Sequence, residues 1–440
     1  MRKTARAARL LGLGSATTVG VATVGWWWVT SDPVKTLGQA FTEAGRLAGL
    51  ASGVAVICLI ALAARFGPLD RAVGSEHLYR WHSSLGGYAV WMVLAHAVLI
   101  TAGYAMTAHE TIGAAIASFA EDPPMMMSIL ALGVVFVIGA ASIVAVRRKL
   151  PYEVWHAIHL ATYAAILLGM VHQVTNGAQF VDHPVASGLW TLAWLVPVLT
   201  LIVNRLIRPV LMNARHRFRI DAVLPEADGV YSVVIGGIAL DKIRAEAGQF
   251  IRVHANAPGL RFASNPYSLS AMPGHRWRIT VGVVGEQSAR LVACPRGTRL
   301  WLEGPMGGLV LGNGPARPVL LAGAGTGIAP MRALAEAVLA KRPNTPIVVW
   351  YRVRDRADAL FKQEWPRLVA ASHGRLVTHL LAGPRTIPGN SITAARIKDI
   401  APWVAGADVF ACGPPGLTRE LTDAARTTGA ASVTTESFGW

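Results

Sequence analysis

Six long apolar runs constrain this chain of 440 residues more than any other feature. Each run is close to the about 20 residues that a helix needs to cross the hydrocarbon core of a bilayer. Hydrophobic residues make up 53% of the whole chain, which is too apolar for a protein that is entirely soluble. We therefore expect six membrane-spanning helices at about Leu10–Thr30, Leu47–Phe66, Trp81–Ala105, Met127–Val146, Val154–Val174 and Gly188–Ile207.

The net charge of +16 comes largely from Lys and Arg residues that flank these runs. Basic residues precede the first run, separate the second from the third, and follow the fourth and the sixth, whereas the loops 106–126 and 175–186 contain none. The positive-inside rule then predicts a multi-pass protein of the plasma or inner membrane with both termini in the cytoplasm. Because the charges form no continuous basic face, we expect the lipid bilayer and no nucleic acid as a partner.

Four histidines lie on two of these runs. His82 and His96 are 14 residues apart on the third run, and His159 and His172 are 13 apart on the fifth, so each gap spans roughly 20 Å of helix axis. Both runs start on the cytoplasmic side and are therefore parallel, which predicts that His82 faces His159 at an inner level and His96 faces His172 at an outer level. Paired neutral imidazoles can hold a haem iron from both sides, so we expect two haem b groups.

Two points of this interpretation stay open. At 100° per residue, the 13-residue gap leaves about 140° of mismatch, so His172 requires a tilt, a long side-chain reach or a local helix irregularity. His156, one turn before His159, is the alternative inner ligand. Buried histidines can also simply bridge helices by hydrogen bonds, but four of them at two matching depths favour metal ligation.

The remainder of the chain has the pattern of two further domains. From about residue 216 to 312, short β-branched and aromatic runs are separated by Gly and Pro turns, which predicts a small antiparallel β-barrel. After a linker at 313–318, strands alternate with helical patterns, which predicts an α/β domain with a parallel sheet. The expected architecture is a cytoplasmic tail (1–9), a six-helix transmembrane domain (10–207), the β-barrel (208–312) and the α/β domain (313–440).

Two turns in the α/β domain have the character of a nucleotide site. A glycine-rich loop follows an apolar strand and opens a helix, where backbone N–H groups can approach a pyrophosphate. A second short motif follows a later strand. The residues concerned are Gly323, Gly325, Gly327 and Pro330 in the first loop and Cys412, Gly413 and Pro414 in the second.

Arg352 and Arg354 follow the strand at about 347–351. A basic fork at this place can hold an adenosine 2′-phosphate and would favour NADPH over NADH. Solvated surface arginines are the alternative, so the nicotinamide preference stays open. The three cysteines, Cys58, Cys294 and Cys412, are scattered and predict neither a disulfide framework nor a zinc or iron–sulfur site.

Taken together, the motifs resemble the ferric reductase/NADPH oxidase-type transmembrane flavocytochromes, in which a ferric reductase-like membrane domain is fused to a ferredoxin-NADP reductase-like module. The stretches that carry the resemblance in the membrane half are Tyr79-Arg-Trp-His82, Ala95-His96, Tyr152-Glu-Val-Trp-His-Ala-Ile-His159 and Met170-Val-His172. The resemblance covers essentially the whole chain, and its histidine spacing implies His159 rather than His156 as the inner ligand.

The resemblance also implies an FAD site in the β-barrel and an NAD(P) site in the α/β domain. Asn265-Pro-Tyr267-Ser268 is similar to the flavin-binding signature, in which Tyr267 and Ser268 would contact the flavin. Asn265 stands where family members usually carry the Arg or His that serves the FAD pyrophosphate. Gly285-Glu-Gln-Ser288 is similar to the second flavin motif, in which backbone N–H groups and a hydroxyl hold phosphate.

Three residues are implied at the place where nicotinamide would meet the flavin. Cys412 lies in the second loop, which in related modules flanks the nicotinamide together with the glycine-rich loop. In related reductases a C-terminal aromatic residue covers the flavin, and Phe438 matches that register. Trp440, two residues further on, is the alternative candidate for this role. Phe438 could also be an ordinary core residue of a final strand, with no contact to the flavin.

The expected function is electron transfer from cytoplasmic NADPH or NADH, through FAD and two haems, to an acceptor on the outer side. Superoxide-forming relatives often carry one more histidine a turn beyond the outer ligand, where this chain has Ile100. Ferric iron or a ferric chelate is therefore preferred as the acceptor, with oxygen second. A haem-free membrane-tethered flavin reductase and a non-enzymatic haem sensor are further alternatives, and the oligomeric state, a homo-oligomer included, stays open.

Overall fold

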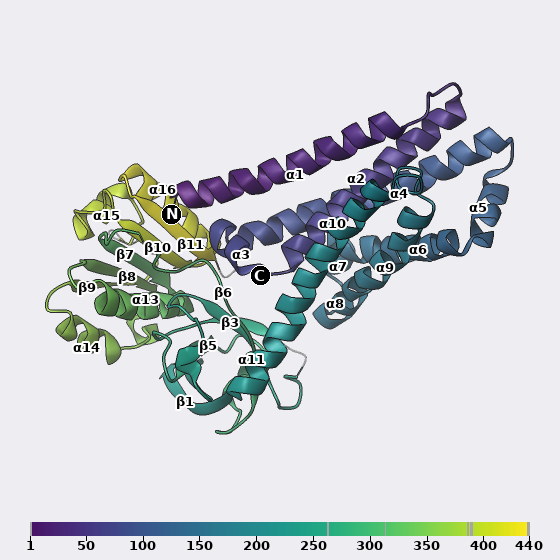
Figure 1. Ribbon diagram of the computed structural model, residues 1–440. Helices are drawn as coiled ribbons and strands as arrows, with labels where there is room; N and C mark the ends of the chain where they lie inside the picture. Colours follow the sequence, from purple (N-terminus) through teal and green to yellow (C-terminus); the bar gives the residue numbers. More distant parts are fainter. Residues whose placement is uncertain (1, 262–263, 313, 385–386, 388–389, 438–440) are drawn as a thin grey trace. The chain divides into compact units, whose positions relative to one another are not determined.

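The computed structural model describes residues 2–261, 264–312, 314–384, 387 and 390–437 (Figure 1). The chain divides into two compact units. The helical unit comprises Arg9–Phe66 and His77–Arg205. The sheet unit comprises the residues up to Ala8, the segment Gly67–Glu76 and everything from Leu206 onward. Each unit is described by itself.

The helical unit is built from long helices joined by short loops. Its helices are α1 (Arg2–Thr30), α2 (Leu37–Ala63), α4 (Ser75–Ala108), α5 (Ile112–Glu121), α6 (Pro123–Ser142), α7 (Val144–Arg147), α8 (Tyr152–Leu160), α9 (Thr162–Thr175) and α10 (Pro184–Ile202). α6 packs along α9, and α2 packs along α10. A π-helical turn, η1 (Val203–Ile207), continues α10 into α11 (Arg208–His216).

Among the described residues, five helices are long and apolar enough to cross a membrane. They are Leu37–Ala63, His77–Ala108, Pro123–Ser142, Val154–Thr175 and Pro184–His216, and they contain most of the second to sixth runs expected from the sequence. The first expected run, Leu10–Thr30, lies within helix α1, which is not one of these five. These five helices indicate a membrane protein.

Glycines along one side of α2 allow neighbouring side chains to approach its backbone. Gly45, Gly49 and Gly53 recur at intervals of four residues, the small-residue spacing that permits close helix packing in membranes. A Cβ atom at Gly45 would meet Ile100 at 2.9 Å, and one at Gly53 would meet Trp190 at 2.6 Å. Larger side chains at these positions would push the neighbouring helices away from α2.

The fifth expected run is not one regular helix, because α8 and α9 are separated at Ala161. The Ala161 N–H bonds to the carbonyls of His159 and Ile158 instead of the residue four positions back, which tightens this turn. The Thr162 hydroxyl also donates to the His159 carbonyl, at 2.6 Å. The irregularity lies between His159 and His172, so the regular rotation assumed for the 13-residue gap does not apply.

The sheet unit begins with an antiparallel β domain. One sheet has the order β1 (Arg219–Ala227), β2 (Val230–Gly236), β5 (Trp277–Gly282), and the other has the order β4 (Asn265–Ser268), β3 (Phe250–Ala255), β6 (Leu300–Met306). Fully buried side chains from both sheets, such as Ile251, Trp277 and Leu302, share one core. The two sheets are joined by isolated bridges, so the antiparallel character is confirmed, while closure into a single continuous barrel stays a prediction.

Asn213 attaches helix α11 to this β domain. Its amide Nδ2 donates to the carbonyl of Leu302 and its Oδ1 accepts from the N–H of the same residue, both at 2.8 Å. Asn213 is buried, so both bonds are shielded from water. Two further short helices of the sheet unit are α3 (Gly67–Val73) and α12 (Glu286–Val292).

The α/β domain contains a five-stranded sheet whose paired strands are all parallel, as the alternating pattern predicted. Its order is β11 (Ser432–Ser437), β10 (Asp408–Gly413), β7 (Val319–Ala324), β8 (Ile347–Val353), β9 (Leu376–Ala382). Alternate residues of β7 face opposite sides of the sheet. Leu321 packs toward α13 (Ile328–Lys341) and α14 (Glu364–Ala371), while Leu320 packs toward α15 (Ala394–Ile400) and α16 (Pro415–Thr427).

An ion cluster links the β domain to the α/β domain within the sheet unit. Arg278 of β5 donates to both carboxylate oxygens of Glu364 at the start of α14, at 2.6 and 3.0 Å. The Nε atom of Arg332, on α13, lies 2.6 Å from the same carboxylate. The carbonyl of Ser270 accepts from both arginines. We refer to Arg278, Glu364 and Arg332 as the interdomain clasp.

Candidate functional site

The four histidines expected at two depths form two pairs in the helical unit. The ring centroids of His82 and His159 are 6.2 Å apart, and those of His96 and His172 are also 6.2 Å apart. The angle between the ring planes is 72° in the first pair and 29° in the second. The structure thus brings together the partners that the parallel orientation of the two runs predicted.

Helix α2 positions the second of these pairs. The Nδ1 atom of His96 lies 2.8 Å from the carbonyl of Gly45, so a proton on Nδ1 would be donated to that oxygen. This tautomer leaves Nε2 of His96 with its lone pair available as a ligand. A Cβ atom at Gly49 would lie 2.7 Å from the same Nδ1, so the glycine makes room for the ring.

A tryptophan that the sequence analysis did not single out contacts the first pair. The Trp155 ring stacks on His159 with centroids 5.1 Å apart and an interplanar angle of 13°. The guanidinium carbon of Arg147 lies 4.5 Å from the centroid of the Trp155 ring. His156, the alternative ligand, is exposed, whereas His159 faces His82. The sequence signal was present, because Trp155 lies four residues before His159, one helical turn away.

The flavin-like signature forms strand β4. The Ser268 hydroxyl is buried and has no hydrogen-bond partner among the described residues. Burial raises the pKa of Tyr267, and a hydrogen bond with Asn265 acts in the opposite direction. Asn265 in turn donates from Nδ2 to the Gln287 side chain at 3.2 Å, which brings the two flavin-like motifs together. Ser268 therefore retains a buried polar atom that a ligand could satisfy.

The second flavin-like motif uses its hydroxyl within its own turn. Ser288 accepts hydrogen bonds from the N–H groups of Val284 and Gly285, each at 3.1 Å, and donates to the Gly285 carbonyl at 2.8 Å. The hydroxyl thereby caps α12. A direct phosphate contact through Ser288 or the Gly285 N–H would require these bonds to be given up.

The two nucleotide-like loops of the α/β domain contact each other. Gly323 lies in β7, and a 3₁₀ turn at Gly325–Gly327 leads directly into α13. Gly325 has φ +54°, a left-handed conformation that favours glycine. A Cβ atom at Gly327 would lie 2.3 Å from the Cys412 carbonyl, so only glycine permits this approach. Pro330 is buried in the first turn of α13.

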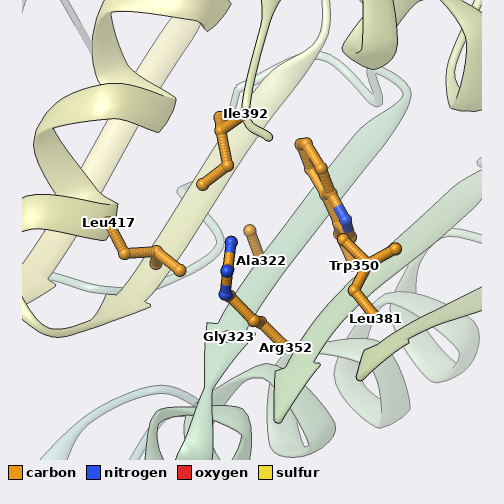
Figure 2. A pocket seen from close by; sticks show the side chains of 7 residues that line it. All are labelled: Ala322, Gly323, Trp350, Arg352, Leu381, Ile392 and Leu417. Atoms are coloured by element: carbon orange, nitrogen blue, oxygen red, sulfur yellow. The ribbon is translucent and has the colours of Figure 1, made fainter. Parts of the chain in front are cut away.

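A pocket opens at the same edge of the parallel sheet (Figure 2). Gly323 and Arg352 line it, and Figure 2 shows the Arg352 side chain between Leu417 and Trp350. The other lining residues are Ala322, Leu381 and Ile392. Arg352 donates to the carbonyl of Asn390 at 2.8 Å. Arg354, two residues along, is exposed outside this lining.

Cys412 is the second-to-last residue of strand β10 and is completely buried. Burial raises the pKa of its thiol well above the usual value, and the carboxylate of Glu436 adds to this effect. Glu436 pairs with Cys412 in the register of β10 and β11. Gly413 is the last residue of β10, and Pro414 is the N-cap of α16. Phe438 and Trp440, the two residues expected over the flavin, lie outside the described residues.

No group of three or more His, Cys, Asp or Glu side chains suited to a metal ion occurs among the residues that the structure describes. The histidines instead occur in twos, which is the number that a haem iron takes when both axial positions are filled by imidazole. Each pair therefore offers the two imidazoles that a haem iron would need.

Comparison with known families matches one segment in each half of the chain. Residues 48–170 match the family described as "Ferric reductase like transmembrane component", and residues 321–423 match "Oxidoreductase NAD-binding domain". Together the two matches confirm the resemblance inferred from the sequence, a ferric reductase-like membrane component joined to an NAD-binding oxidoreductase module. Both matches support an NAD(P)H-dependent oxidoreductase of the membrane.

Individual relatives resemble part of the chain. It is 31% identical to the ferredoxin reductase component of 3-ketosteroid-9-alpha-monooxygenase from Mycolicibacterium smegmatis, over 46% of this chain and 57% of that protein. It is 29% identical to the reductase component of the naphthalene 1,2-dioxygenase system of Pseudomonas putida, over 36% of this chain and 50% of that protein. The chain thus spans about half the length of the curated relatives it matches.

Among solved structures, the Amycolatopsis cytochrome P450 reductase GcoB is 23% identical, with a TM-score of 0.44 over 51% of this chain and 69% of that one. The FAD/NAD-binding domain of the Vibrio cholerae nitric oxide dioxygenase is also 23% identical, with a TM-score of 0.43 over 51% of this chain and 99% of that one.

Proposed function

We propose that this protein transfers electrons from cytoplasmic NAD(P)H to a ferric acceptor on the outer side of the membrane, with FAD and two haems b as the carriers. One observation carries the proposal: two histidine pairs whose ring centroids are 6.2 Å apart on helices of the membrane part. Two metal–nitrogen bonds of about 2 Å each, plus the distance from nitrogen to ring centre on either side, give a separation of roughly 6 Å. Both pairs therefore have room for one iron atom.

The ligands we propose are His82 and His159 for the inner haem and His96 and His172 for the outer haem. The hydrogen bond from His96 Nδ1 to the Gly45 carbonyl supports this assignment, because metal-bound histidines usually donate their other ring N–H. The break at Ala161 lies between His159 and His172, and this local helix irregularity supports His172 as a ligand despite the 13-residue spacing.

Residues of the sheet unit would bind the flavin and the nicotinamide nucleotide. FAD, when bound, accepts a hydride from NAD(P)H and supplies single electrons to the haems, which carry one electron each. The buried, unpartnered hydroxyl of Ser268 supports a hydrogen bond to the flavin, and Tyr267 supplies an aromatic contact beside it. Since Ser288 caps its own helix, we assign the phosphate contact of the second motif to backbone groups of α12 that the capping leaves available.

For the nucleotide, we propose that Gly325, Gly327 and the start of α13 receive the pyrophosphate, since helix N-termini stabilise anions. Cys412, which lies against Gly327, would border the nicotinamide together with Gly413 and Pro414. Arg352 and Arg354 would face the adenosine end and favour NADPH. Phe438, or alternatively Trp440, would cover the flavin until the nicotinamide displaces it.

The membrane arrangement is part of the same proposal. We assign residues 10–207 to a six-helix domain with α1 as its first span, 208–312 to FAD binding and 313–440 to NAD(P) binding. Both termini would be cytoplasmic in a plasma or inner membrane, because the loops at 106–126 and 175–186 contain no Lys or Arg.

The residue one turn beyond His96 favours a ferric acceptor over oxygen. This residue is Ile100, which packs against Gly45 of α2. The position therefore serves helix packing and supplies no additional imidazole to the outer side.

Inside-out vesicles provide the test, because their outer surface is the cytoplasmic face. NADPH or NADH is added outside, the haem absorbance is followed, and the lumen contains either chelated Fe(III) or oxygen alone. We expect haem reduction followed by Fe(II) formation in the lumen, and no luminal Fe(II) in a His96→Leu variant. Superoxide in place of Fe(II) would establish the oxygen alternative. A purified protein without a Soret band, although haem was supplied, would leave only the flavin reductase alternative.

A further inference from the structure

The two histidine pairs differ in the relative orientation of their rings. In the His82–His159 pair the imidazole planes are crossed at 72°, whereas in the His96–His172 pair they are closer to parallel, at 29°. The centroid separation is 6.2 Å in both, so the pairs differ in the relative orientation of their rings and not in their separation.

Different neighbours hold the rings in the two pairs. His96 is oriented by a hydrogen bond from Nδ1 to the Gly45 carbonyl, at 2.8 Å. His159 has no such bond, because its Nδ1 is buried without a hydrogen-bond partner among the described residues. Its ring instead lies parallel to the Trp155 ring, 5.1 Å away at 13°. Arg147 covers Trp155, with its guanidinium carbon 4.5 Å from the ring centroid.

We propose that Trp155 is the positioning residue of the inner ligand His159, and that it makes the two haem sites electronically different. The inference rests on the proposed function, since it takes His159 to be an iron ligand. Stacking on Trp155 restricts rotation of the His159 ring about its side-chain bond, which a hydrogen bond does for His96. The cation–π contact with Arg147 in turn restrains Trp155.

The orientation of the rings has a direct electronic consequence. Each imidazole interacts through its π orbital with the iron d orbital that lies perpendicular to the ring plane. Two crossed rings would interact with two different iron d orbitals to the same extent, so these two orbitals would stay nearly equal in energy. A low-spin ferric iron of this kind gives a strongly anisotropic electron paramagnetic resonance (EPR) signal. Two parallel rings would interact with the same d orbital, so the two orbitals would differ in energy and the signal would be an ordinary rhombic one. We expect one signal of each kind from this protein.

The reduction potentials of the two sites should differ in a consistent direction. A hydrogen bond from His96 to the Gly45 carbonyl makes this ligand more basic, which stabilises the ferric state and lowers the potential. His159 lacks that bond, and Arg147 places a positive charge near it, which stabilises the reduced state. The inner site therefore has the higher potential of the two.

The test uses the full-length protein purified with haem, studied by low-temperature EPR and by a spectroscopic redox titration. The variants are Trp155→Leu, which removes the stacking ring, and Trp155→Phe, which keeps an aromatic face. Trp91→Leu is the matched control, because Trp91 is 72% exposed on the same helix as His82 and His96. Haem content is measured for each protein.

In the wild-type protein we expect one strongly anisotropic and one rhombic signal in equal amounts. Trp155→Leu should shift or abolish the anisotropic signal and lower the higher midpoint potential, while the rhombic signal stays unchanged. Trp155→Phe should restore the wild-type spectrum, and Trp91→Leu should not alter it.

Two similar signals in the wild-type protein would overturn the inference, as would a Trp155→Leu protein that holds two haems with an unaltered spectrum. Both results still require bound haem, so they leave the proposed function intact. A protein that binds no haem would instead refute the proposed function itself.

Discussion

The interdomain clasp makes Glu364 the most informative position for a stability measurement. The carboxylate receives two hydrogen bonds from Arg278, at 2.6 and 3.0 Å, and lies 2.6 Å from Nε of Arg332. Glu364→Gln keeps the size and one oxygen acceptor but removes the negative charge. The two guanidinium groups would then lose the anion that they share, and only Arg332 would keep a carboxylate partner among the described residues, Glu336 at 2.6 Å.

The expected cost follows from how far these groups are withdrawn from water. Removal of one partner from a fully buried ion pair costs about 3–5 kcal/mol. The side chains of Arg278 and Arg332 are only 13% and 10% exposed, but that of Glu364 is 25% exposed, and glutamine retains part of the hydrogen bonding. We therefore expect a loss of about 2 kcal/mol, which corresponds to a fall in Tm of about 4–8 °C for a unit of this size.

The assay is thermal unfolding of the full-length protein in detergent, followed by tryptophan fluorescence and by flavin release. Asp399→Asn is the matched control, because Asp399 is 66% exposed and pairs with Arg396 on the surface of α15. Such a pair contributes about 0.3–0.5 kcal/mol. If Glu364→Gln lowers Tm no more than Asp399→Asn does, the clasp does not stabilise the contact between the two domains.

The pH dependence of this difference is a second check on the same residue. Burial raises the pKa of Glu364, but the hydrogen bonds and charges of Arg278 and Arg332 outweigh it, and the pKa lies below its usual value of 4.5. The carboxyl is thus more acidic in the folded state than in the unfolded state. Its stabilisation is complete above the unfolded value and is lost as pH falls through the folded one. The Tm difference between wild type and Glu364→Gln should be constant over about pH 5–8 and shrink in more acidic solution.

Three further predictions concern single positions. Gly49→Leu should halve the haem content, because a Cβ atom at this position would lie 2.7 Å from the His96 ring. Gly133→Leu is the control and should keep both haems, because a Cβ atom there meets nothing within 4 Å. Equal haem loss in the two variants would contradict this reasoning. Cys412 should resist iodoacetamide at neutral pH and react after denaturation, because its side chain is completely buried and burial also raises the pKa of its thiol. Mass spectrometry would detect the label, and labelling in the folded protein would refute this burial. Arg354→Ala should raise the KM for NADPH about tenfold and leave the KM for NADH unchanged. The tenfold change corresponds to the loss of one charged contact of about 1.4 kcal/mol. Equal changes in the two KM values would show that Arg354 does not recognise the 2′-phosphate.

Much of the candidate site was predictable from the sequence because it depends on spacing along one helix or on one turn. The distance from His82 to His96 fixes their separation along α4, whatever lies around that helix. Gly325 and Gly327 were recognisable because a turn between a strand and a helix needs glycine. The structure gives each a reason, a left-handed φ at Gly325 and the close approach of the Cys412 carbonyl at Gly327.

Other features depended on contacts between segments that the sequence does not relate. The tightened turn at Ala161 follows no Pro or Gly, so no local rule predicts it. In the second flavin-like motif, Ser288 is the residue type that the sequence led us to expect for a phosphate contact, but its hydroxyl caps α12 instead. Residue type alone does not say which of several possible hydrogen bonds a hydroxyl makes.

By itself, the sequence determined that this is a membrane chain followed by a β domain and a parallel α/β domain. Long apolar runs must form helices in a bilayer because no water is there to satisfy the backbone, and period and turn residues specify the remainder. Only the tertiary structure decided how the rings of His96 and His159 are held, one by the Gly45 carbonyl of α2 and the other by Trp155. The orientation of a ring depends on which atoms surround it, and those atoms come together only when the helices pack.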